Sequence, residues 1–155
     1  MVVQNVKKNF KIDPFRGHAE DEDMGPWETA VREAHEESCG VLDFSGVAAP
    51  TGLAASRNDK GEWTFFVRLM NDAATFSALF AAFDTNFNLA REEKFEETLG
   101  MALLDVNDKS IGDIRVAEQM MNLLSKVQSM DVGKLPVVTL TPSQKPGTFT
   151  AVQTN

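Results

Sequence analysis

PWETAVREAHEES, residues 26–38, predicts the first helix of this chain. Pro26 suits the first helical position, because its ring fixes φ near the helical value. Gly40 follows the stretch at the place where a left-handed residue ends many helices. We therefore expect a helix from Pro26 to Ser38 whose apolar face buries Trp27, Ala30, Val31 and Ala34.

Three carboxylates lie on the polar face of this predicted helix. Residues three and four apart are neighbours on a helix surface, so Glu33, Glu36 and Glu37 are expected to converge. Like charges at this spacing repel by roughly 0.2–0.5 kcal/mol per pair. A hard divalent cation turns that repulsion into coordination, because magnesium prefers carboxylate oxygens. The cluster indicates a metal site, with a solvated acidic helix face as the alternative.

The residues ahead of the helix extend this pattern. They run GHAEDEDMGPWETAVRE from Gly17 to Glu33, and AHEESCGV follows at 34–41. The whole stretch resembles the Nudix box, the signature of the Nudix hydrolase family: a glycine, five residues, a glutamate, seven residues, then R-E-U-x-E-E-x-G-U, with U aliphatic. The residues in register with its second half are Arg32, Glu33, Ala34, Glu36 and Glu37. FRGHAE, residues 15–20, is similar to the loop that many members write as W/F-P-K-G-H-x-E.

The loop departs from the family pattern by one residue. Counted forward from Gly17, the first glutamate of the pattern falls on Asp23; counted back from Arg32, it falls on Met24. We interpret this as one extra loop residue, with Asp23 standing in for the glutamate.

The end of the helix carries a second departure. Ser38 and Cys39 stand between Glu37 and Gly40, where the pattern has a single residue, so one of the two lengthens the helix exit. Cys39 is the only cysteine, which excludes an internal disulfide and is typical of a reducing compartment. We expect it to be a small half-buried residue at the helix end.

The resemblance implies a fold and an activity. The fold is α/β (α+β): a Nudix-like α/β/α sandwich with a mixed β-sheet, its amino-terminal strands abbreviated because only 16 residues precede Gly17. The activity is that of a magnesium-dependent pyrophosphohydrolase, which cleaves a phosphoanhydride in a nucleoside diphosphate derivative or related polyphosphate; Mn²⁺ is the second metal considered. Two other hypotheses stay open: a non-catalytic Nudix-fold protein that binds a nucleotide or a protein partner, and an unrelated α+β protein with an acidic helix.

The resemblance also implies roles for the box residues. Glu36 and Glu37 are the expected magnesium ligands, and Glu33 is a third ligand or positions the attacking water. The carbonyl group of Gly17 is a further ligand. Arg32 is expected to point elsewhere on the helix, where its counterpart in the family orients the loop.

The partner of Arg32 is left open between Asp23 and Glu22. In the family, a further acidic group often comes from a later loop, and the candidates here are Glu92, Glu93, Glu96 and Glu97. Glu96 or Glu97 is the expected general base, and a solvated acidic turn is the alternative for each.

Substrate contacts are predicted from residue type. His18 matches the K-G-H form of the loop, and it is joined by four candidate cations and three candidate stacking residues: Arg16, Arg57, Lys60 and Arg68, then Phe15, Trp63 and Phe87. The resemblance of the loop to the G-H type of the family implies dinucleoside polyphosphates, diphosphoinositol polyphosphates or capped RNA ends as substrates.

The composition limits the classes of molecule that the protein is expected to bind. The 155 residues fit one domain, and the net charge of −8 argues against broad contact with nucleic acid or anionic membrane. A capped RNA end is the one nucleic-acid substrate that stays in consideration. No apolar run approaches 18 residues and no leader is visible, so a cytoplasmic protein without a membrane span is expected.

The rest of the chain predicts a Nudix-like domain at 1–134 and a β-prone tail at 135–155. Strands are expected at Val2–Lys7, Asn9–Ile12, Val47–Ser56, Glu62–Met70, Met101–Val106, 135–141 and 148–152, and helices at Asp72–Phe83 and Ile114–Met130. A turn at Asn58–Gly61 predicts a hairpin. The tail either completes the sheet or pairs two copies of the chain as a homodimer.

Overall fold

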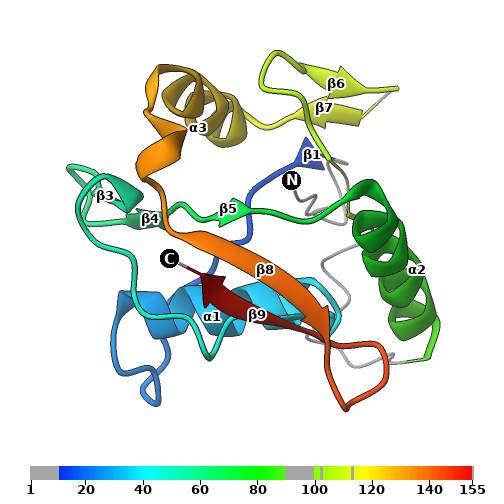
Figure 1. The fold of residues 1–155 in the computed structure, drawn as a ribbon. Helices are drawn as coiled ribbons and strands as arrows, with labels where there is room; N and C mark the ends of the chain where they lie inside the picture. The colour runs from blue at the N-terminus through cyan, green and yellow to red at the C-terminus, as the bar shows by residue number, and fades with distance from the viewer. Residues whose placement is uncertain (1–10, 90–99, 102, 113, 155) are drawn as a thin grey trace.

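The computed structural model describes residues 11–89, 100–101, 103–112 and 114–154. The fold is mixed α/β, as predicted (Figure 1). The elements are β1 (Lys11–Ile12), α1 (Pro26–Glu37), β2 (Leu42–Asp43), η1 (Gly52–Ala54), β3 (Ala55–Arg57), β4 (Trp63–Phe65), β5 (Arg68–Leu69), α2 (Ala73–Leu89), β6 (Ser110–Ile111), β7 (Ile114–Val116), α3 (Glu118–Ser129), η3 (Val132–Lys134), β8 (Val137–Pro142) and β9 (Phe149–Thr154).

A four-stranded mixed sheet, ordered β2-β9-β8-β5, forms the centre of the fold. β8 and β9 make its antiparallel middle pair, while β2 and β5 add parallel to the outer sides. Val138 and Leu140 of β8 are buried with Phe149 and Ala151 of β9, and the residues between them are more exposed. Because side chains alternate along a strand, the sheet buries one face.

The main core lies on that face and includes residues of α1 and α2. Ala34 of α1 and Leu79 and Phe83 of α2 belong to the same buried cluster as the sheet residues. In Figure 1, α1 lies behind β9 and α2 stands beside the sheet. The segment 135–154, predicted as a tail, therefore supplies the two middle strands against which α1 packs.

Two asparagine side chains connect the four-stranded sheet and its helices through hydrogen bonds to backbone groups. The Asn71 side chain accepts from Leu140 N and donates to Leu140 O, both at 2.9 Å, and so continues the ladder beyond β5. Asn86 donates through Nδ2 to the carbonyl oxygens of Cys39, at 3.0 Å, and Gly147, at 3.1 Å. The second set of bonds ties α2 both to the α1 exit and to the β8–β9 turn.

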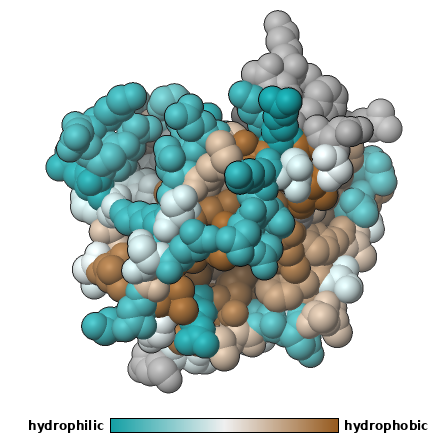
Figure 2. Space-filling view, turned by 90° about the horizontal axis from the view of Figure 1, so that it is seen from above, coloured by the Kyte–Doolittle hydropathy of each residue, from teal (hydrophilic) through white to brown (hydrophobic). Residues whose placement is uncertain are grey.

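A second, smaller core joins β1, β7 and α3. It contains Ile12, Val116, Met120 and Leu124, all buried. β1 pairs parallel with β7, and the Ile12 carbonyl accepts from Ala117 N at 2.9 Å. The view from above in Figure 2 shows hydrophobic residues exposed among hydrophilic ones. No helix in the described part of the chain is long and apolar enough to cross a bilayer.

Several predicted elements are confirmed. α1 starts at Pro26 as expected and ends one residue before Ser38. Asp72 caps α2 by accepting from Thr75 N at 2.9 Å, and a hairpin joins β3 to β4 around Asn58–Gly61. β8 and β9 fall on the two predicted runs of the tail.

Other predictions are wrong. Ile114–Val116 is strand β7, and α3 starts only at Glu118. Ile114 has helical spacing with Ala117 but strand spacing with Val116, and the strand forms. Val47–Ser56 is mostly irregular, with a short 3₁₀ turn at Gly52–Ala54 ahead of β3.

Two further segments differ from the prediction. Glu62–Met70 divides into β4 and β5, and the described residues of 101–106 form no strand. Val2–Lys7 lies outside the described residues, as do residues 9–10 of the second predicted strand.

Candidate acidic site on helix α1

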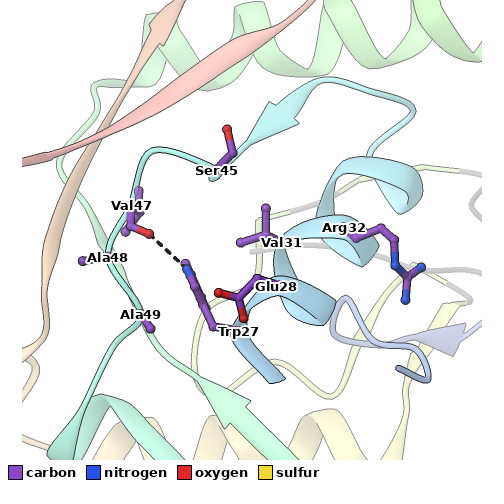
Figure 3. Close-up of a pocket in the computed structure, with 8 residues that line it drawn as sticks. All are labelled: Trp27, Glu28, Val31, Arg32, Ser45, Val47, Ala48 and Ala49. Carbon is purple, nitrogen blue, oxygen red and sulfur yellow. Dashed lines mark hydrogen bonds between the residues drawn. The ribbon is translucent and has the colours of Figure 1, made fainter. Parts of the chain in front are cut away.

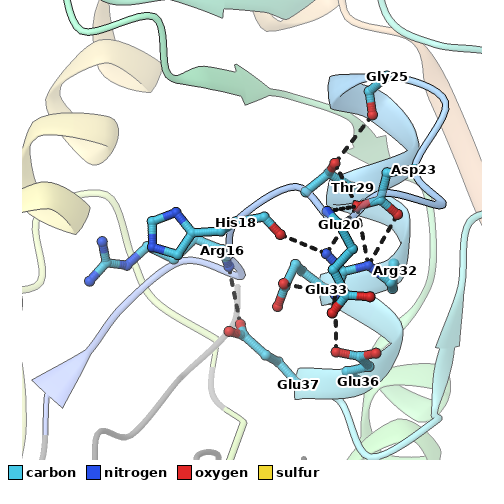
Figure 4. Close-up of polar contacts among 10 residues, drawn as sticks. All are labelled: Arg16, His18, Glu20, Asp23, Gly25, Thr29, Arg32, Glu33, Glu36 and Glu37. Carbon is cyan, nitrogen blue, oxygen red and sulfur yellow. Dashed lines mark hydrogen bonds and ion pairs between the residues drawn. The ribbon is translucent and has the colours of Figure 1, made fainter.

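Arg32 and Asp23 connect α1 to the loop before it (Figure 4). Arg32 Nε lies 3.1 Å from Asp23 Oδ1, and Nη2 lies 3.1 Å from Oδ2. Asp23 also accepts from Glu20 N at 2.8 Å and from Thr29 Oγ1 at 2.9 Å. These bonds, that of Arg32 first, lower the pKa of Asp23 to about 2. Of the two partners left open by the sequence, the structure selects Asp23 rather than Glu22.

The guanidinium of Arg32 also reaches the acidic face of the helix. Nη1 lies 3.0 Å from Glu33 Oε1, 3.2 Å from Glu36 Oε2 and 3.4 Å from Glu20 Oε1, while Nη2 donates to the His18 carbonyl at 2.8 Å. The expectation that Arg32 points elsewhere is therefore wrong. Its long side chain presents five donors, enough to serve the loop and the glutamates together. The hydrogen bond with Asp23 raises its pKa further above the ordinary value, so it stays charged.

Gly17 lies directly against the carboxylate of Glu33. A Cβ at position 17 would stand 1.8 Å from Glu33 Oε1 and 1.9 Å from its carboxyl carbon, far inside van der Waals contact. Only glycine leaves that space to the carboxylate. Burial is the main cause that raises the pKa of Glu33, while Arg32 acts in the opposite direction.

Glu37 is the most buried of the three glutamates, with 4% of its surface exposed. Its Oε2 accepts from the backbone N–H of Arg16 at 3.1 Å. The Arg16 side chain turns instead to Asp13, with Nε 3.1 Å from Oδ2. Arg16 thus meets the site through its backbone, whereas the sequence predicted a side-chain contact with substrate.

The donor set fits magnesium by its chemistry. Glu33, Glu36 and Glu37 supply hard carboxylate oxygens, and the space kept open at Gly17 lies against the first of them. As they stand, no three His, Cys, Asp or Glu side chains within the described ranges are grouped to hold a metal ion. Glu33 and Glu36 meet at Arg32 Nη1, and Glu37 meets the Arg16 amide. A cation would compete with Arg32 for the first two carboxylates.

The remaining candidate residues are placed as follows. His18 is exposed, and its backbone carbonyl joins the network through Arg32. Arg68 lies on β5, where its amide donates to the Pro136 carbonyl at 2.9 Å and its side chain is exposed. Glu97, with Glu92, Glu93 and Glu96, lies outside the described residues. His35 faces away from the glutamates, with Nδ1 3.0 Å from the Leu42 carbonyl oxygen.

The one residue more than the family pattern between Glu37 and Gly40 is accommodated by a left-handed turn at the end of α1. Cys39 has φ 54° and Gly40 has φ 78°, and the Gly40 amide donates to the His35 carbonyl at 2.8 Å. Ser38 Oγ accepts from the Leu42 amide at 3.0 Å and so starts the chain into β2. Cys39 is buried, and burial raises the pKa of its thiol to about 11, as for an inert structural cysteine.

Sequence reasoning missed a surface hollow beside the network (Figure 3). It encloses about 370 Å³ and is lined by Trp27, Glu28, Val31, Arg32, Ser45, Val47, Ala48 and Ala49. Trp27 Nε1 donates to the Val47 carbonyl at 3.0 Å and fixes one wall. Segment 45–49, which forms the opposite wall of the hollow, has no periodic pattern of apolar residues, so the sequence did not predict it.

Comparison with known proteins adds no relative: the chain matches no protein-family model, no curated protein and no solved structure. The likeness to the Nudix box thus remains a likeness of residues 17–41 alone.

Proposed function

We propose that the protein is a magnesium-dependent pyrophosphohydrolase of the Nudix type. The observation that carries the proposal is the contact between Gly17 and the Glu33 carboxylate. It joins the first residue of the box-like pattern to the acidic helix face 16 positions later in the chain, with no room for a side chain between them. A solvated acidic helix has no need of a loop glycine at that place.

Each residue then has a defined task. Glu33, Glu36 and Glu37 would hold the metal, which when bound supplies positive charge for the phosphate oxygens and acidifies a bound water. Arg32 and Asp23 position the loop against the helix, and the Arg16 amide holds Glu37. The substrate class is a nucleoside diphosphate derivative or a related polyphosphate.

The proposal includes the family's α/β/α sandwich as the fold. α1 against the buried face of the four-stranded sheet corresponds to the interface between a helical layer and the sheet. The β8–β9 hairpin would then occupy sheet positions that the family fills from ahead of the box.

The test is hydrolysis of a substrate panel by wild type and Glu36→Gln. Dinucleoside polyphosphates, nucleotide sugars, dinucleotides, capped RNA and diphosphoinositol polyphosphates are each offered with Mg²⁺ and with Mn²⁺. We expect metal-dependent turnover that falls at least ~100-fold in Glu36→Gln, since a metal ligand is lost. Glu118→Gln, an exposed glutamate in the first turn of α3, is the matched control and should keep wild-type activity. Turnover that survives Glu36→Gln would refute the assignment.

A second function, nucleotide binding without catalysis, is favoured by one observation. Arg32 already engages Glu33 and Glu36, so the network is complete as an ion-pair cluster. The two functions separate in a thermal melt, because a ligand of the native state raises Tm. Turnover absent from the whole panel, with Mg²⁺ still raising Tm of wild type but not of Glu36→Gln, would favour the binding protein.

A further inference from the structure

A second hollow opens at the amino-terminal end of α1 and is mostly apolar. It encloses about 230 Å³ and is lined by Pro26, Trp27, Glu28, Ala49, Pro50, Ala55, Trp63 and Phe65. The rings of Trp63 and Phe65 lie parallel, with centroids 6.0 Å apart and planes 6° from each other. Trp27 meets Phe65 edge to face at 5.2 Å. Trp63 is 44% exposed, so a large flat ring is open to a ligand.

A side chain of the neighbouring strand favours the observed orientation of the Trp63 ring. Arg57 lies across the β3–β4 pair from Trp63, and its Cζ stands 5.8 Å from the ring centroid. Such a cation–π contact favours this orientation of the indole, with the guanidinium over one of its two faces. A preorganised aromatic wall costs little ordering when a flat ligand stacks on it.

Among the described residues that line the hollow, Glu28 alone is charged. Glu28 is exposed to solvent, and within the described part of the structure its carboxylate has no hydrogen bond or ion pair with protein, so both of its oxygens are accessible to a ligand. A carboxylate can only accept hydrogen bonds. The hollow therefore matches a flat ring that carries N–H donors on one edge.

Glu28 also connects the hollow to the acidic site. Glu28, Arg32 and Glu36 are spaced four residues apart and form one row along the surface of α1. At 1.5 Å per residue, the row spans about 12 Å. Glu28 and Arg32 both line the larger hollow between the two places. A ligand can thus lie along the helix with its ring at Glu28 and its phosphates near Glu36.

We propose that this hollow binds a guanine base, stacked on Trp63 and Phe65, with Glu28 accepting hydrogen bonds from its N1–H and 2-amino group. Guanine presents these two donors side by side, and a carboxylate has two oxygens to receive them. Adenine offers one donor and one acceptor on the same edge, so its ring nitrogen would face an oxygen of Glu28. The inference rests on the proposed function only in naming the base of its nucleotide substrate.

The experiment measures nucleoside binding without metal. Guanosine and adenosine are titrated into the full chain in EDTA, and the indole N–H signals of Trp27 and Trp63, the only two tryptophans, are followed by NMR. We expect guanosine to shift the Trp63 signal and to bind at least ~10-fold more tightly than adenosine, since guanine offers the Glu28 carboxylate two donors and adenine only one. Trp63→Ala should weaken guanosine roughly 5- to 100-fold, the range of base–aromatic stacking.

Glu28→Gln provides the specificity readout. Its amide presents one donor and one acceptor, so the preference for guanosine should fall to near parity, while Glu118→Gln should keep it. Equal binding of both nucleosides by wild type would overturn the inference, as would a proline-rich peptide that shifts Trp63 when guanosine does not. Because neither metal nor turnover is involved, guanosine preference can hold when the hydrolase proposal fails, and the reverse.

Discussion

Two nitrogens of Arg32 donate hydrogen bonds to the Asp23 carboxylate: Nε lies 3.1 Å from Oδ1, and Nη2 lies 3.1 Å from Oδ2. This two-pronged bond fixes both the distance and the plane of the two groups. Asp23 lies in the loop and Arg32 in the second turn of α1, so the bond sets where the loop stands over the helix. Four predictions follow from this arrangement and from its surroundings.

The first prediction concerns acid. The pKa of Asp23 is about 2 in the fold and 3.8 ordinarily, so its ionised form is favoured by folding. A depressed carboxyl pKa contributes stability above its ordinary value, and that stability is lost as pH falls through the folded value. We expect Tm of wild type to fall between about pH 4 and pH 2, and Asp23→Asn to lose this part of the slope. Scanning calorimetry from pH 2 to pH 5 tests it, with Glu22→Gln as the loop control. Parallel curves for wild type and Asp23→Asn would contradict it.

The second prediction concerns Gly17. Gly17→Ala places a methyl group where the Glu33 carboxylate lies, and the carboxylate must swing away from Arg32. Because a side chain and not the backbone gives way, the loss of unfolding free energy should be small, about 1 kcal/mol. The rise in Tm caused by Mg²⁺ should nevertheless disappear. Gly100→Ala, where an added Cβ meets nothing within 4 Å, is the control. A full Mg²⁺ effect in Gly17→Ala would show that Glu33 is no ligand.

The third prediction concerns the cost of the Glu33 charge. Burial raises the pKa of Glu33, so the fold disfavours its ionised form, and the stability associated with its neutral form is lost as pH rises through the folded pKa. At pH 7.5 without metal, Glu33→Gln should therefore melt at a higher temperature than wild type. The difference should vanish at pH 3, where the carboxyl is protonated. With Mg²⁺ the order should reverse, because only wild type gains a ligand. A lower Tm of Glu33→Gln at pH 7.5 in EDTA would refute the reasoning.

The fourth prediction concerns the border of the sheet. Asn71 makes both a donor and an acceptor bond with the backbone of Leu140, which is buried. Asn71→Ala leaves these backbone groups unpaired and should cost about 1–3 kcal/mol in urea unfolding. The Leu140 amide should also exchange with solvent faster. Asn88→Ala, an exposed asparagine of α2, is the control and should change stability by less than about 0.5 kcal/mol. Equal stability of the two variants would mean that water replaces the Asn71 bonds at no cost.

The sequence predicted those elements whose first and last residues are marked by local signals, such as a proline, a glycine or a capping side chain. Pro26 and Gly40 bracket α1, and the cap at Asp72 starts α2. The resemblance to the Nudix box narrowed the loop partner of Arg32 to Asp23 or Glu22, and the structure selects Asp23. These features depend on neighbours in the chain, which the sequence displays directly.

The rest depends on contacts between distant segments. Ile114 fits both the helical stripe of α3 and, with Val116, the alternation of a strand, and pairing with β1 and β6 decides for the strand. The Arg32–Glu36 pair follows from helical spacing, but the contacts of Arg32 with His18 and Asp23 depend on how the loop folds over α1. The hollow at Trp63 needs segment 49–55 folded over α1. No periodicity in the chain records such meetings.

The pairing of β2 with β9 has a consequence for synthesis. The Thr148 hydroxyl donates to the carbonyl of Gly40, 108 positions earlier, and β9 continues from there beside β2. While the ribosome still holds residues 149–154, the apolar face of α1 lacks the strand that covers it. The nascent chain therefore exposes the apolar side of α1 until β9 has emerged and paired with β2, and such exposed apolar surface is what chaperones bind.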